Sequence, residues 1–288
     1  MEIRIKYDSS YRDELGHARV SLMNNSVHRI INPRRANTAT FYNLPPGSTD
    51  CIVTLDGKVV KRDLVEILSR DHFIEVIVPL ENRKVVAFFL GGAGDKDSYY
   101  FSGPYGNIDD ARAPFDKRIK DTGKSEYYTS YYLSYSDARG KSDIKKYIKD
   151  NVGPKETPIY IVGHSLGAWN GAHLSKLLAD DGYTVKMLIT LDPVGAGALV
   201  WVGSDIYRTK PEPSADMWIN VLADPKDPDQ SDSVANFGER WIIKSGPDIN
   251  AIMDINHASA RGMFHNRIQN DLSAADHMFN AIDAYINR

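Results

Sequence analysis

The chain has 288 residues, of which 42% are hydrophobic, 25% charged and 10% aromatic, and its formal net charge is −3. These values are typical of globular proteins and exclude disordered and collagen-like classes, while the length allows one large domain or two smaller ones. A nearly neutral chain gives no reason to expect nucleic acid as a partner, because such binding depends on neutralising phosphates.

The start of the chain bears on where the protein is synthesised, and the single cysteine limits the bonds and metal sites that the chain can form. Residues 1–6 alternate apolar and charged side chains, whereas a signal peptide has a continuous apolar stretch. No window approaches the roughly 18 apolar residues of a transmembrane segment. We therefore expect a cytoplasmic protein as synthesised; if it acts elsewhere, such as in a target cell, something other than a classical signal peptide must carry it there. The lone Cys51 excludes an internal disulfide and a Cys-rich zinc site, and its apolar neighbours favour a buried thiol in a strand.

Residues 1–81 predict a small all-β domain. Short runs of alternating or β-branched residues are separated by turn residues such as Pro45-Pro46-Gly47, a spacing typical of an antiparallel sandwich. The segment 41–47 resembles a turn of transthyretin-like and collagen-binding-B-type sandwiches, which implies an accessory domain without chemistry of its own. The expected strands lie near residues 3–7, 18–22, 38–42, 51–55 and 73–78.

Residues 82–288 show a different rhythm, in which apolar strands alternate with amphipathic helices. This alternation predicts an α/β domain with a mainly parallel sheet covered on both faces. The boundary between the two expected domains is a short polar segment near residues 81–83. The expected strands lie near residues 85–90, 131–135, 159–162, 185–191, 218–222 and 240–245, and the last helix spans about 274–288.

The motif Gly163-His164-Ser165-Leu166-Gly167 lies between a buried strand and an amphipathic helix. This G-x-S-x-G pattern puts a serine on a tight strand-to-helix turn, where the two glycines remove Cβ atoms that would collide with the strand and the helix. The backbone N–H of Leu166 then points at an oxyanion that develops beside Ser165. The motif in this setting predicts that Ser165 is a nucleophile.

Residues 159–195 resemble the α/β-hydrolase superfamily, in particular lipases and phospholipases of the G-H-S-L-G type. The resemblance rests on the motif around Ser165 and on Leu191-Asp192-Pro193-Val194-Gly195, and it implies that Asp192 is the acid of a catalytic triad. Asp192 also ends an apolar strand, where the functional groups of parallel sheets gather. Asp224, which follows the next strand, remains the alternative acid.

The base of such a triad is expected after the last strand, and three histidines can supply it. If residues 240–245 form that strand, His257 lies in the following loop, where the superfamily has its base. His277, in the first turn of the last helix, and His265 remain alternatives. His164 is not expected to be the base, because its side chain leaves the turn on a different side from the nucleophile.

Glycine-rich and aromatic loops after the strands predict the rest of the site. The run 91–94 follows the first strand of the α/β region, and in the superfamily this loop supplies the second oxyanion N–H. Gly92 is the expected donor, with Ala93 as the alternative. The loops 98–105 and 194–202, the latter with Trp201, are expected to form an acyl pocket or a lid, because such loops suit an apolar substrate.

Together these residues predict a serine hydrolase that needs no metal or organic cofactor. Ser165 attacks an ester carbonyl, His257 acts as general base and then acid, and Asp192 orients the imidazolium. The resemblance implies a lipid ester as the substrate, as in lipases and phospholipases. A β-sandwich ahead of a compact hydrolase also resembles bacterial lipase effectors of type VI secretion, which implies an immunity protein and a component of the secretion machinery as partners.

Other functions remain open at this stage. A cytosolic esterase or thioesterase of small acyl substrates would use the same triad, and so would a peptidase. A binding protein could keep a hydrolase fold without the chemistry, since fold does not determine function. Candidates for nucleophile, acid and base in the expected chain order favour an enzyme.

Overall fold

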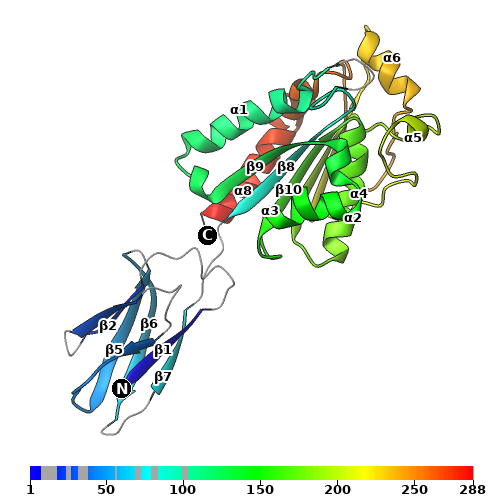
Figure 1. Ribbon diagram of the computed structural model, residues 1–288. Coiled ribbons are helices and arrows are strands. Elements are labelled where there is room, and N and C mark those ends of the chain that lie inside the picture. Colours follow the sequence, from blue (N-terminus) through cyan, green and yellow to red (C-terminus); the bar gives the residue numbers. More distant parts are fainter. Residues whose placement is uncertain are drawn as a thin grey trace. The chain divides into compact units, whose positions relative to one another are not determined.

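The computed structural model describes residues 1–7, 18–23, 27–31, 38–55, 57–68, 73–78, 84–98 and 103–287. The chain divides into two compact units, Met1–Asn82 and Arg83–Arg288 (Figure 1). The boundary expected at residues 81–83 lies outside the described residues, as do residues 99–102 of the first predicted pocket loop. None of the helices in the described ranges has the length and apolar character that a bilayer crossing requires.

The N-terminal unit contains two β-sheets that share one apolar core. One sheet has the order β3-β2-β5-β6 with antiparallel neighbours, and the other has the order β4-β1-β7. Side chains from both sheets, such as Ile3, Val20 and Val76, are buried in the same cluster. The strands are β1 (Glu2–Tyr7), β2 (Ala18–Leu22), β3 (Val27–Ile31), β4 (Thr38–Thr40), β5 (Gly47–Leu55), β6 (Lys58–Ile67) and β7 (Phe73–Val78).

This unit differs from the sequence prediction in two respects. β1 and β7 are parallel, so the expected antiparallel pairing holds for the other neighbouring strands of the two sheets but not for this pair. Strands from opposite ends of a segment are not joined by a hairpin and can pair in either direction. β3 and β6 were not predicted, because their side chains do not alternate cleanly: Val59 and Leu64 are exposed, whereas Val65 and Ile67 are buried.

Cys51 is a buried residue of β5, which confirms the expected strand thiol. Burial raises the pKa of the Cys51 thiol to about 11, and the charge of Asp63 adds to this effect. A thiol that stays protonated is a poor nucleophile. Cys51 therefore serves the packing of the core.

The second unit is built on a six-stranded sheet in which every neighbouring pair is parallel. Its strand order is β13-β12-β11-β10-β8-β9. The expected α/β class with a mainly parallel sheet is thereby confirmed. The strands are β8 (Val85–Gly91), β9 (Tyr128–Ser134), β10 (Ile159–His164), β11 (Val185–Leu191), β12 (Met217–Ala223) and β13 (Ile249–Met253).

Helices cover both faces of this sheet (Figure 1). α1, α7 and α8 share a core with Phe89 and Val162, and α4 and the helix of residues 141–152 share another with Phe88 and Ile161. Consecutive side chains of a strand point to opposite faces, so the central strands β8 and β10 contribute to both cores and read as largely apolar runs. The helices are α1 (Asn107–Asp121), α2 (Lys141–Asp143), η5 (Ile144–Lys149), α3 (Asp150–Val152), α4 (Leu166–Asp180), α7 (Ala260–His265) and α8 (Ala274–Ile286).

The last strand of the sheet is β13 and not residues 240–245, so that part of the prediction is wrong. Residue Arg240 forms only an isolated bridge with Val194. Trp241 and Ile243 are buried in the core cluster around α4, although they belong to no strand. Their apolar character therefore reflects the packing of a loop. His257 still follows the last strand, because it comes four residues after β13 ends.

The order of the strands reverses at β8, which has β9 on one side and β10 on the other. In open parallel sheets, a crevice forms at such a reversal outside the carboxyl ends of the strands. The loop after Gly91 and the turn after His164 both leave the sheet at this crevice. The remaining elements are η3 (Ser125–Tyr127), η4 (Tyr135–Ala138), α5 (Val200–Gly203), α6 (Gln230–Phe237), β14 (Arg267–Gln269) and β15 (Leu272–Ser273).

Candidate active site

Ser165 lies on a strained turn between β10 and α4. Its φ and ψ are 57° and −126°, a combination that residues other than glycine rarely adopt. A Cβ on Gly163 would lie 2.5 Å from the carbonyl oxygen of Gly167, and a Cβ on Gly167 would lie 2.2 Å from the carbonyl oxygen of Leu90. Both glycines are therefore required by the close approach of strand and helix, as the motif predicts.

The side chains of Ser165, His257 and Asp192 form one hydrogen-bonded chain. Oγ of Ser165 lies 3.0 Å from Nε2 of His257, and Nδ1 of His257 lies 2.6 Å from Oδ2 of Asp192. The three residues are 8%, 6% and 0% exposed. This geometry suits the tautomer in which Nδ1–H donates to Asp192 and Nε2 accepts the proton of the serine hydroxyl.

Asp192 follows β11 and is surrounded by hydrogen-bond donors. The backbone N–H of Ala223 donates to Oδ1 at 3.2 Å, and Nε of Arg240 lies 3.1 and 2.8 Å from the two oxygens. Burial alone would raise the pKa of Asp192, but hydrogen bonds and charges from His257 and Arg240 hold it below its usual value. Asp192 is therefore ionised at neutral pH and can stabilise an imidazolium.

The imidazole of His257 is held in its neutral form. Burial lowers the pKa of His257, and the hydrogen bond to Asp192 offsets this only in part. The positive charge of Arg240 lowers the pKa of His257 further. A neutral imidazole is the form that can take a proton from a serine hydroxyl.

The peptide groups of His257 are held on both sides. Its N–H donates to Oδ1 of Asp232 at 3.0 Å, and its carbonyl lies 2.7 Å from Nε2 of His164. Since a carbonyl can only accept a hydrogen bond, Nε2 of His164 carries a proton. The other ring nitrogen of His164, Nδ1, lies 3.9 Å from a carboxylate oxygen of the buried Asp95. His164 thus fixes the loop that carries His257.

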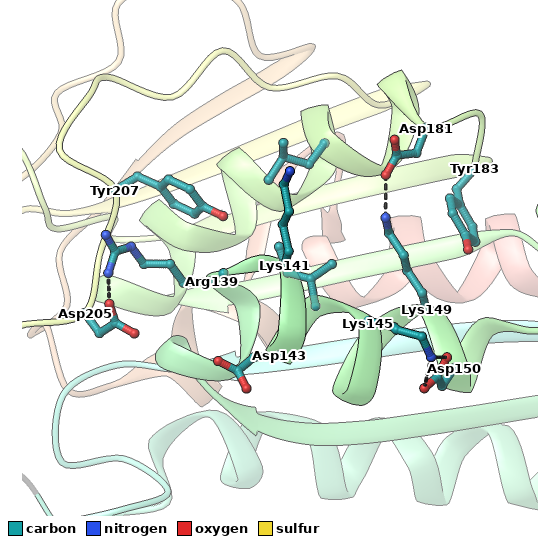
Figure 2. Close-up of a pocket in the computed structure, with 13 residues that line it drawn as sticks. Arg139, Lys141, Asp143, Lys145, Lys149, Asp150, Asp181, Tyr183, Asp205 and Tyr207 are labelled. Carbon is teal, nitrogen blue, oxygen red and sulfur yellow. Dashed lines mark hydrogen bonds and ion pairs between the residues drawn. The ribbon is translucent and has the colours of Figure 1, made fainter.

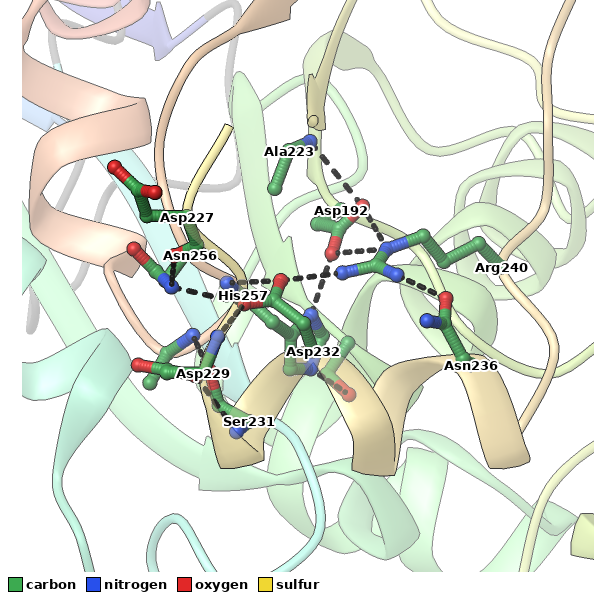
Figure 3. A network of polar contacts seen from close by, with 12 residues as sticks. Asp192, Ala223, Asp227, Asp229, Ser231, Asp232, Asn236, Arg240, Asn256 and His257 are labelled. Carbon is green, nitrogen blue, oxygen red and sulfur yellow. Dashed lines mark hydrogen bonds and ion pairs between the residues drawn. The ribbon is translucent and has the colours of Figure 1, made fainter. Parts of the chain in front are cut away.

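Arg240 extends this network to α6 (Figure 3). Its Nη2 lies 2.7 Å from Oδ1 of Asp232, and its Nη1 donates to Oδ1 of Asn236. The second oxygen of Asp232 accepts a hydrogen bond from Asn256 at 2.9 Å. The Arg240 side chain is 11% exposed. A continuous polar network therefore runs from Asp192 to α6.

Two backbone segments flank Ser165. Leu166 is the first residue of α4, and the N–H groups of a first helical turn have no partner within the helix. A Cβ on Gly92 would lie 2.6 Å from Cβ and 3.1 Å from Oγ of Ser165. Only glycine allows the 91–94 loop to approach this closely, and Ala93 of the same loop lines the cavity beside Ser165.

An apolar cavity of about 470 Å³ opens at Ser165. The predicted loop 194–202 contributes to it, but Trp201 turns away and donates from Nε1 to the carbonyl of Gly195 at 2.8 Å. Leu199, Val202, Val234 and Phe237 form an exposed apolar rim. The lining residues are Ala93, Ser165, Leu166, Val194, Leu199, Val200, Val202, Gly203, Val234, Ala235, Phe237 and Gly238.

No protein-family model matches the chain, and no curated protein matches it. Within the described ranges, no group of three or more His, Cys, Asp or Glu side chains is arranged to bind a metal ion.

The alternative residues lie elsewhere. Asp224 is exposed at the end of β12. His265 lies with Nε2 2.8 Å from the carbonyl of Ala111. His277 is in the first turn of α8, where its Nε2 is buried without a hydrogen-bond partner in the described part of the chain. The position beside Ser165 is taken by His257.

A larger cavity of about 1030 Å³ lies beside the helix of residues 141–152 (Figure 2). Its walls carry charges of both signs, as well as Tyr183 and Tyr207. None of the residues of the Ser165 network lines it. Its ion pairs are Arg139 with Asp205, Lys145 with Asp150, and Lys149 with Asp181.

The contribution of Asp232 was not predicted, although its local pattern is readable. Asp229 and Asp232 form a capping box at the start of α6, in which the N–H of Asp229 donates to Oδ2 of Asp232. That spacing predicts a helix start only. The contact of Oδ1 with His257 joins residues 25 positions apart, so no local signal could have revealed it.

Proposed function

We propose that this protein is a serine hydrolase of the α/β-hydrolase type, which cleaves carboxylic esters through an acyl-serine intermediate. The observation that carries the proposal is the buried hydrogen-bonded chain from Ser165 through His257 to Asp192. The order of nucleophile, acid and base along the chain is that of α/β-hydrolases. The strained backbone of Ser165 supports the same conclusion, because strain of this kind is typical of functional turns.

The geometry supports a two-step mechanism. Oγ of Ser165 attacks the carbonyl carbon while Nε2 of His257 takes the hydroxyl proton, and the backbone at Gly92 and Leu166 stabilises the resulting oxyanion. The imidazolium then gives its proton to the leaving alcohol as the C–O bond breaks, and the acyl group stays on Ser165. His257 then deprotonates a water molecule, which attacks the acyl carbonyl. The bond between the acyl carbon and Oγ breaks as the imidazolium returns the proton to Ser165, and the acid is released. Asp192 stays ionised and orients the imidazole throughout.

The cavity favours a lipid ester as the substrate. Apart from Ser165 itself, its lining side chains are apolar, and its volume of about 470 Å³ lies within the usual range for small-molecule sites. The apolar rim of Leu199, Val202, Val234 and Phe237 extends this surface to the exterior, where a contiguous apolar patch suits lipid. Small acyl esters and thioesters would fill less of the cavity.

Covalent labelling tests this proposal. The full chain and its Ser165→Ala and Ser125→Ala variants are treated with a fluorophosphonate and assayed with p-nitrophenyl acetate, butyrate and octanoate. Ser125 is exposed in η3 and serves as the control. We expect label and hydrolysis in the wild type and in Ser125→Ala, and neither in Ser165→Ala. A wild-type protein that takes no label and cleaves no ester would overturn the proposal in favour of a binding protein.

A further inference from the structure

Arg240 contacts two buried carboxylates at once. Its Nε lies 2.8 Å from Asp192 and its Nη2 lies 2.7 Å from Asp232, whose side chains are 0% and 3% exposed. Charges removed from water in this way need several partners with good geometry, because their desolvation is costly. The planar guanidinium meets this need, since it offers donors in fixed directions to both acids.

The same guanidinium is tied to the wall of the apolar cavity. Asp232 and Asn236 stand four residues apart on α6, so that they lie on one face of the helix, and both accept hydrogen bonds from Arg240. Val234 and Phe237 of the same helix line the cavity at Ser165. The position of this wall is therefore coupled to Arg240.

Asp232 joins the wall to the base. Its Oδ1 accepts hydrogen bonds from both the guanidinium of Arg240 and the backbone N–H of His257, at 2.7 and 3.0 Å. Arg240 thus reaches His257 by two routes, through the Asp192 carboxylate to the ring and through Asp232 to the main chain. A shift of α6 would disturb both the wall and the base.

We propose that Arg240 is a positioning residue that holds the wall helix α6 and the Asp192–His257 pair in one arrangement. It acts through Asp192 and Asp232 and does not itself line the cavity. The proposal rests on the proposed function, because it gives Arg240 a part in hydrolysis by Ser165. It links the binding of the acyl chain along α6 to the alignment of the base.

The charge of Arg240 makes this role measurable. The charged and titratable groups around the imidazole of the base are Asp192, Arg240, Asp232, His164 and, behind His164, Asp95. Arg240 is the arginine of this group, and its charge opposes protonation of the imidazole. Without the charge of Arg240, the negative charges of the carboxylates favour the imidazolium, so the pKa of His257 rises.

The test compares pH profiles of kcat/KM for the full-length wild type and the variants Arg240→Gln, Arg240→Lys and Arg118→Gln, with p-nitrophenyl butyrate. Arg118 pairs with Asp276 away from the site and provides the matched control. We expect Arg240→Gln to lower kcat about 10- to 100-fold, a loss typical of removing a residue that orients an active-site side chain. The acid limb of this variant should move to higher pH, because the charge of Arg240 no longer lowers the pKa of His257. Arg240→Lys should keep the acid limb of the wild type and recover part of kcat, and Arg118→Gln should match the wild type.

A second readout tests the coupling to α6. Arg240→Gln should also reduce the ratio of kcat/KM for the octanoate to that for the acetate, because the wall that contacts the longer chain loses its anchor. A ratio equal to that of the wild type would overturn the coupling to the wall.

The remaining outcomes separate positioning from mere structural support. A uniform loss of rate in Arg240→Gln with an unmoved acid limb, or a kcat equal to that of the wild type, would overturn the proposal. If Arg240→Gln does not fold, Arg240→Lys decides: a reduced kcat at an unmoved limb supports the role, and a wild-type kcat overturns it. Fluorophosphonate labelling of the wild type is measured first, because its absence overturns the proposed function, whereas normal labelling with an unaffected Arg240→Gln overturns only this inference.

Discussion

Two cavities of the second unit differ in the burial of the polar groups around them as well as in size. The larger, of about 1030 Å³, is lined by ion pairs such as Lys145 with Asp150, whose side chains are 70% and 53% exposed (Figure 2). Beside the smaller cavity, of about 470 Å³, Asp192 and Asp232 are buried with full sets of partners. Exposed pairs contribute little energy and can be lost cheaply, whereas a buried pair that loses one partner is strongly destabilised. The polar groups beside the smaller cavity are therefore the ones held in a fixed arrangement.

The largest difference between the two cavities is expected when Asp192 is replaced, because the loss of activity should be greatest there. Asp192→Asn should lower kcat for p-nitrophenyl butyrate about 10⁴-fold, because the amide no longer enforces the reactive tautomer of His257. The control is Lys145→Ala in the larger cavity, which removes an exposed pair and should leave kcat unchanged. Circular dichroism checks that both variants fold. A larger loss of kcat in Lys145→Ala than in Asp192→Asn would assign the reaction to the larger cavity instead.

The close approach of Gly92 to Ser165 predicts the next largest effect. In Gly92→Ala the new Cβ would lie 2.6 Å from Cβ of Ser165, so the loop must shift. We expect kcat to fall about 10²- to 10³-fold, as when an oxyanion donor is lost, with little change in KM. Gly171→Ala is the matched control, because its Cβ would lie 3.1 Å from a methyl carbon of Leu90 and 3.2 Å from one of Ile161, and not against backbone or Ser165. Equal rates for the two variants would argue against an oxyanion site at Gly92.

The part of the site that sequence could predict is the part with local signals. Ser165 sits in a short motif whose glycines have a steric purpose, and Asp192 ends an apolar strand. The sequence predicts His257 in the loop after the last strand, and it lies there, although that strand is β13 and not residues 240–245. The three were expected to meet, and they lie in one hydrogen-bonded chain. Their catalytic role stays a prediction.

The rest depends on contacts that sequence does not encode locally. The sequence pattern predicts Arg240 only as the start of a strand, whereas its guanidinium bridges residues 48 and 8 positions away. In the N-terminal unit, β6 carries apolar side chains on its exposed as well as its buried face, which hides the period of two. In both cases tertiary packing decides the outcome, and a single sequence does not show it.

The burial of the network beside Ser165 predicts its pH dependence. Because burial lowers the pKa of His257 below its usual 6.5, the imidazole stays neutral as pH falls to that value. The acid limb of kcat/KM should therefore lie below pH 6.5, with full activity at neutral pH and loss of activity only under more acidic conditions. The measurement is a kcat/KM profile on p-nitrophenyl butyrate between pH 4 and 8, at constant ionic strength. A limb above pH 6.5 would mean that Asp192 outweighs burial.

The smallest effect is expected at the exposed apolar rim. Phe237 is 66% exposed at the cavity, and Phe73 of the N-terminal unit is 62% exposed, so the two offer the same substitution at similar exposure. Partial burial of one aromatic ring against an acyl chain contributes about 1 kcal/mol. Phe237→Ser should therefore lower kcat/KM for p-nitrophenyl octanoate about 3- to 10-fold and leave the acetate unaffected. Phe73→Ser should change neither rate. If Phe237→Ser lowered both rates equally, α6 would act on the triad alone, and the apolar rim would not bind the acyl chain.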